Sequence, residues 1–144
     1  MEPHVADIVR VIQLVVAPVF LLTAVSTLIV ALNTRLGRAV DRRRLLEDAV
    51  LTLQGERAAS AREELVQIGR RVRCVYLAIL FAVVCGLFVC LLIMSAFLGG
   101  LTGGDMSRII AALFIVAMLA LIASLLLFLR EIFLAVSTPR HVPQ

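Results

Sequence analysis

Three long runs of apolar residues constrain the fold of this chain more than any other feature of its sequence. They cover about residues 11–32, 75–98 and 109–129, and the second and third contain no charged residue. A helix needs about 20 apolar residues to cross a hydrocarbon core of about 30 Å, and core helices of soluble proteins rarely keep such a run beyond about 14. The sequence therefore predicts an all-α integral membrane protein, a single membrane domain over residues 1–144 with three transmembrane helices.

The composition supports this class: 62% of the residues are hydrophobic, whereas soluble domains are about half apolar. The first apolar run is expected to be a retained transmembrane helix and not a cleaved signal peptide. Glu2 and Asp7 precede the lone Arg10, where a signal peptide carries positive charge, and the run is longer than the usual apolar region of a signal.

Arginine placement predicts the orientation in the membrane. Residues 34–73 hold ten arginines and six acidic residues, whereas the rest of the chain holds four of each. Short loops rich in Lys and Arg stay on the cytoplasmic side. We therefore expect the N-terminus and the glycine-rich loop 99–108 outside, and residues 34–73 and the C-terminus in the cytoplasm.

Residues 34–73 have the periodicity of an amphipathic helix, with apolar residues at steps of three and four. Gly55 lies near the midpoint, where a glycine favours a turn or break. The pattern fits a cytoplasmic antiparallel helical hairpin with its turn near 54–55, and also a single amphipathic helix on the membrane surface. Arg43 falls on the apolar stripe and needs Glu47 or a lipid phosphate as its partner.

Most of the arginines flank the membrane boundary. They are expected to contact anionic lipid headgroups and to fix the topology, since each basic group near an anionic leaflet contributes about 1 kcal/mol. A cytoplasmic protein partner is the alternative; nucleic acid is not favoured, because acidic residues are interspersed and aromatic residues are absent from the segment. The residues are Arg35, Arg38, Arg42, Arg43, Arg44, Arg70, Arg71 and Arg73.

Two patterns within the apolar runs indicate contacts. Small residues recur every four positions at Ala78, Ala82, Gly86 and Cys90, which favours close helix packing within the chain or in a homo-oligomer. Polar residues cluster on one face of the first run. That face either lines a water-filled pathway in an oligomer or bonds to its own backbone or to a neighbouring helix. The polar residues are Gln13, Thr23, Ser26, Thr27, Asn33 and Thr34.

Signals for catalysis are lacking in the sequence. His4 and His141 lie in the terminal tails without a companion nucleophile, and no motif indicates a metal or cofactor. We expect a non-enzymatic protein without a cofactor that acts by helix–helix assembly or through its arginine-rich hairpin. The alternative is an oligomeric ion channel lined by the polar face of the first helix.

The stretches "IQLVVAPVFLLTAVSTLIVALNTRLGRAVDRRR" (12–44) and "LLLFLREIFLA" (125–135) carry a family resemblance. The chain resembles a family of small bacterial multi-pass membrane proteins known only as a domain of unknown function. The resemblance implies three helices in the inner (cytoplasmic) membrane of a bacterium, and it supplies no activity, ligand or catalytic residue.

Overall fold

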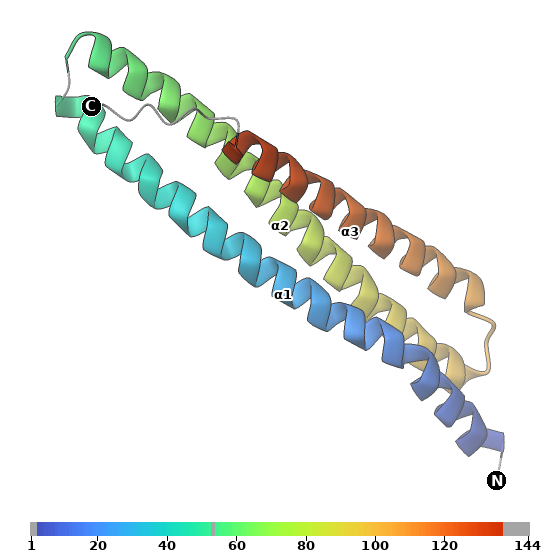
Figure 1. The fold of residues 1–144 in the computed structure, drawn as a ribbon. Coiled ribbons are helices and arrows are strands. Elements are labelled where there is room, and N and C mark those ends of the chain that lie inside the picture. The colour runs from blue at the N-terminus through green and yellow to red at the C-terminus, as the bar shows by residue number, and fades with distance from the viewer. Residues whose placement is uncertain (1–2, 53, 137–144) are drawn as a thin grey trace.

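The computed structural model describes residues 3–52 and 54–136, almost all of them in three helices. Helix α1 covers Pro3–Thr52, α2 covers Glu56–Thr102 and α3 covers Ser107–Val136. Each is long and apolar enough to cross a membrane. The helices run side by side in alternating directions, with α2 between α1 and α3 (Figure 1).

Glycine and aspartate residues set the two connections. Gly55 has φ +71°, a left-handed conformation that favours glycine, and its carbonyl accepts the first backbone bonds of α2 from Ala58 and Ala59. Gly103 ends α2 in the αL conformation. Asp105 accepts hydrogen bonds from the backbone and hydroxyl of Ser107 at the start of α3, and these bonds lower the pKa of the Asp105 carboxyl.

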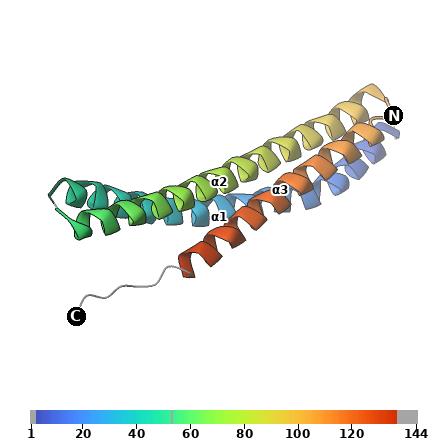
Figure 2. The same ribbon diagram turned by 90° about the horizontal axis from the view of Figure 1, so that it is seen from above.

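Helix α1 is unbroken at Pro18, and it continues beyond its apolar part and past the arginines to Thr52. The chain turns at Gly55, and α2 returns beside α1, so residues 34–73 form two arms and not one continuous helix. Both views show that these arms extend beyond the C-terminal end of α3 (Figures 1 and 2). We call the part of α1 and α2 from residue 34 to residue 73 the hairpin.

The core runs along one face of each helix at alternating steps of three and four residues. On α2 this core stripe consists of buried residues 75, 78, 82, 85, 89, 92 and 96. On α3 it includes Ala117, Ala120 and Ser124, and on α1 it includes Val15, Val25 and Leu32. A repeat averaging 3.5 residues is the spacing of helices that wind around one another in a left-handed sense.

Candidate functional site

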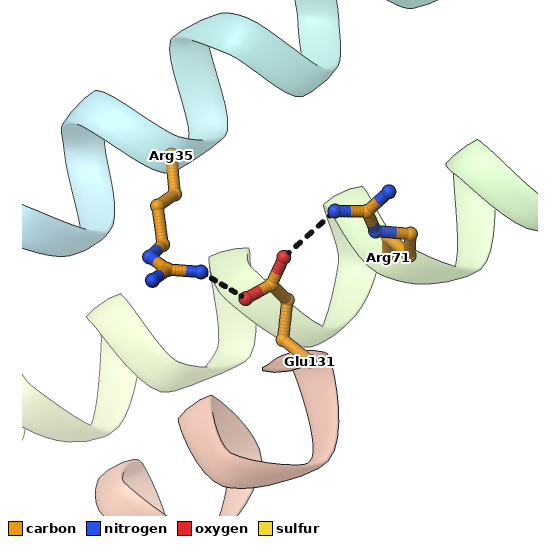
Figure 3. Close-up of polar contacts among 3 residues, drawn as sticks. All are labelled: Arg35, Arg71 and Glu131. Atoms are coloured by element: carbon orange, nitrogen blue, oxygen red, sulfur yellow. Dashed lines mark hydrogen bonds and ion pairs between the residues drawn. The ribbon is translucent and has the colours of Figure 1, made fainter. Parts of the chain in front are cut away.

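A buried carboxylate joins all three helices where the hairpin leaves the apolar bundle. Glu131 of α3 is 3% exposed, and its two oxygens accept from different helices. Arg35 Nη1 of α1 lies 3.2 Å from Oε2, and Arg71 Nη2 of α2 lies 3.0 Å from Oε1 (Figure 3). We call these three residues the clamp. A buried carboxylate is stable only when it is paired, and here two guanidinium groups pair with it.

The helical repeat places the clamp directly beside the apolar core. Glu131 follows Ser124 on the core stripe of α3 by seven residues, so its side chain points inward. Arg35 comes three residues after the buried Leu32, and Arg71 comes four residues before the buried Val75. The clamp is therefore the first polar layer beyond the apolar core, and it lies at the same level on all three helices.

The two arginines of the clamp have different environments. The guanidinium carbon of Arg35 lies 5.0 Å from the ring centre of Phe128, close enough for a cation–π contact. Arg71 has no such ring contact among the described residues, and its Nε is buried without a hydrogen-bond partner there. The side chains remain 41% and 30% exposed respectively, so the outer edge of the clamp is open to its surroundings.

A small cavity lies between the arms of the hairpin, next to the clamp. Its volume is about 150 Å³. Arg42 and Glu64 line it and form an ion pair across the arms, with Arg42 Nη2 and Nε 2.6 and 3.2 Å from the same carboxylate oxygen. We call it the hairpin cavity; its lining residues are Ala39, Arg42, Glu64, Gln67, Ile68 and Arg71.

The remaining arginines at the membrane-proximal end of the hairpin differ in their partners. Arg43 pairs with Glu47 at 2.8 Å, one of the two partners that its position on the stripe allowed. The others are exposed and form no ion pair within residues 8–134; these are Arg38, Arg44, Arg70 and Arg73. Four guanidinium groups are thus available for phosphate or for a partner.

Charge is unevenly distributed along the hairpin. Its base, residues 34–44 and 65–73, holds eight arginines and one acidic residue, a net charge of +7. Its tip, residues 45–64, holds two arginines and five acidic residues, a net charge of −3. Because α1 and α2 are antiparallel neighbours, the two basic segments lie beside each other in space.

The small-residue positions fall in two environments. Ala78 and Ala82 are fully buried, and the Ser124 hydroxyl of α3 donates to the Ala78 carbonyl at 2.7 Å, which shows how closely α2 and α3 approach. A Cβ atom at Gly86 would lie 3.9 Å from Leu22 of α1. Cys90, however, is exposed, and Cys85 lies in the core. Strict four-residue steps advance about 40° per step around a helix, so they leave the core stripe after two or three steps.

The polar residues of the first helix lie on the outside of the three-helix bundle. All six are exposed: Gln13, Thr23, Ser26, Thr27, Asn33 and Thr34. The four hydroxyls donate to the backbone carbonyl of the residue four positions earlier on α1, at distances of 2.9–3.5 Å. Their hydrogen-bonding needs are therefore met within the helix, as one of the two sequence interpretations expects.

Sequence reasoning missed Glu131, the central residue of the clamp. The signal was present, because Glu131 is an isolated acid in the apolar stretch "LREIFLA" and lies a whole number of heptads from Ser124 and Ala117. Within residues 8–134, no group of three or more His, Cys, Asp or Glu side chains could hold a metal ion.

Three helices that are each long and apolar enough to cross a membrane indicate a multi-pass membrane protein, and a buried carboxylate paired with two arginines joins them at one level. A family model described as "Protein of unknown function (DUF2721)" matches residues 15–141. The chain belongs to this family, which confirms the resemblance to a domain of unknown function. No curated protein and no solved structure matches the chain.

Proposed function

We propose that this is a non-enzymatic bacterial inner-membrane protein that presents its helical hairpin to the cytoplasm and acts by assembly or interaction through it. The proposed orientation puts the N-terminus outside and the C-terminus in the cytoplasm. The observation that carries the proposal is the charge distribution of the hairpin, with +7 at its base and −3 at its tip.

This distribution suits a hairpin that projects from an anionic membrane surface. The four arginines at the base that form no ion pair within residues 8–134 can contact lipid phosphates, and an anionic leaflet repels the acidic tip. At 1.5 Å per residue, the arm from Arg35 to Thr52 reaches about 27 Å from the clamp, beyond the headgroup layer. The tip is then free to meet a protein partner or a second copy of the chain.

A labelling experiment tests the orientation. Ala59 near the tip and Thr102 at the far end of α2 are both exposed, so a cysteine at either position can react. In a background without Cys74, Cys85 and Cys90, an impermeant maleimide added to intact cells should label Thr102→Cys and leave Ala59→Cys unlabelled. Permeabilised cells should show both. Labelling of position 59 alone in intact cells would reject the proposed orientation.

A crosslinking experiment tests the action through the hairpin. A photoreactive residue at Ala59 should crosslink to another protein chain, either a partner or a second copy. The same residue at Val30 is the matched control, because Val30 is exposed on the apolar part of α1, where lipid is expected. Crosslinks confined to position 30 would place the interaction within the membrane and contradict a role for the hairpin.

A further inference from the structure

Arg71, which lines the hairpin cavity, has a donor that its ion pair leaves unused. Arg71 uses Nη2 for Glu131, while its Nε is buried and has no hydrogen-bond partner among the described residues. A buried N–H without a partner is unfavourable, so an acceptor bound beside it would be stabilising. Gln67, from the preceding turn of α2, lines the same cavity and can supply a side-chain amide.

The charges around the cavity favour an anion. Three guanidinium groups, Arg35, Arg42 and Arg71, form the ion pairs of the clamp and the cavity with two carboxylates, Glu64 and Glu131. The group is therefore left with one unbalanced positive charge. Both hydrogen bonds from Arg42 go to a single oxygen of Glu64, through Nε and Nη2, so Nη1 of Arg42 remains without a hydrogen bond to any described residue.

The size and position of the cavity indicate the class of anion. A volume of about 150 Å³ has room for about five water molecules or for one tetrahedral oxyanion. Arg71 precedes the buried Val75 by one helical turn, which is about 6 Å, so in a membrane spanned by the apolar core the cavity would begin at the level of lipid headgroups. Arginine forks bind phosphate oxygens through paired N–H groups.

We propose that the hairpin cavity binds one phosphate group, held by the side chains of Arg42, Gln67 and Arg71 that line it. The group belongs either to an anionic lipid headgroup or to free phosphate. Binding requires only the folded chain, so the site can be tested in detergent whichever way the protein faces in a membrane. Failure of the orientation experiment and failure of this one are therefore distinguishable.

Thermal unfolding of the purified full chain in a neutral detergent measures the binding. A thiol-reactive fluorophore can report unfolding in a Cys90→Ser background, because Cys74 and Cys85 are buried and Cys90 is exposed. Inorganic phosphate should raise Tm in a saturable way relative to chloride at the same ionic strength. Equal Tm values in phosphate and chloride at every concentration would overturn the proposal and leave a cavity filled by water.

Two uncharged changes separate the cavity from general charge effects. Ala39→Leu fills the cavity and should abolish the phosphate-dependent rise in Tm, while Ala59→Leu, at an exposed position, should retain it. Gln67→Leu removes one donor to a charged ligand, so half-saturation should need about tenfold more phosphate. Arg73→Gln, which removes an exposed unpaired arginine, should leave half-saturation within about twofold. A phosphate effect that survives Ala39→Leu would show binding elsewhere and contradict the proposal.

Short-chain lipids distinguish the two sources of phosphate. If the ligand is a headgroup, dihexanoyl phosphatidylglycerol should stabilise the protein at lower concentration than inorganic phosphate, and Ala39→Leu should remove that effect as well. If the ligand is free phosphate, only inorganic phosphate should show an effect that depends on Ala39. Dihexanoyl phosphatidylcholine is the control for the acyl chains, since its headgroup has no net charge.

Discussion

Among single residues, Glu131 is expected to contribute most to the packing of the three helices, because its carboxylate is buried between two arginines from different helices. An apolar residue around it can be replaced by another apolar residue. Two guanidinium groups at one level, by contrast, need an acidic residue between them. Arg35 gains a second partner in the Phe128 ring, whereas Arg71 Nε has no hydrogen-bond partner among the described residues. The two arginines of the clamp therefore differ in their contacts beyond the shared carboxylate.

Replacing Glu131 with alanine should destabilise the protein by about 2–4 kcal/mol. The reason is that two arginines lose their shared carboxylate, and the lower part of this range is expected because both remain partly exposed. Glu47→Ala is the matched control, since it breaks the exposed Arg43–Glu47 pair and should change stability by about 0.5 kcal/mol or less. Reversible denaturation in mixed micelles measures both; equal effects would show that the clamp contributes no more than a surface pair.

Gly86→Ala should leave stability unchanged or raise it by up to about 1 kcal/mol. The new Cβ would meet Leu22 at 3.9 Å, an ordinary contact, and alanine favours the helix. Gly100→Ala provides the comparison, because its Cβ would lie 3.0 Å from a Val11 methyl group and force a shift. Thermal unfolding of the two variants should therefore rank Gly86→Ala above Gly100→Ala, and the opposite ranking would contradict the close approach of α1 and α2 at Gly100.

At the scale of the helices, the core stripe of α2 decides which face meets its neighbours. The alternation of three- and four-residue steps keeps the stripe toward α1 and α3 over the whole apolar length, from Val75 to Ala96. The Ser124–Ala78 hydrogen bond then fixes how closely α3 approaches. The predicted four-residue spacing of small residues follows this core stripe only over its first part, at Ala78 and Ala82.

Ala82→Leu and Cys90→Leu test this register directly. Ala82 is fully buried between helices, so a leucine there should overpack the core and cost about 1–3 kcal/mol. Cys90 is exposed on the outer face, so a leucine should be accepted with little change in Tm. If Cys90→Leu lowered Tm more than Ala82→Leu, position 90 would be packed against another chain in an assembly.

At the scale of the whole molecule, two surfaces distinguish an interaction protein from a channel: the polar face of α1 and the hairpin. The polar face of α1 points outward, and its hydroxyls already donate to the α1 backbone. The base of the hairpin, by contrast, presents four exposed arginines without ion pairs within residues 8–134. The exposed polar chemistry is therefore concentrated on the hairpin and not along a pathway through the bundle.

Reconstituted liposomes should show no ion flux above that of protein-free vesicles. A pore lined by α1 would have Thr23 and Thr27 in its wall, and their hydroxyls, which already donate to the α1 backbone, have no O–H left to donate to water or an anion. Flux that changes when Thr23 and Thr27 are replaced by valine would instead support the oligomeric channel. Flux unaffected by the two valines would exclude this face as the pathway.

The three apolar runs and the glycine-rich connections were sufficient to predict an all-α chain with three helices, because helix length and hydropathy are local properties of the sequence. The Arg43–Glu47 pair was predictable for the same reason, as its partners are four residues apart. Glu131 could be noticed in "LREIFLA" but not assigned, since Arg35 and Arg71 are 96 and 60 residues away along the chain. Only tertiary packing brought these three charges to one level, placed Cys85 rather than Cys90 in the core, and left a cavity beside Arg71.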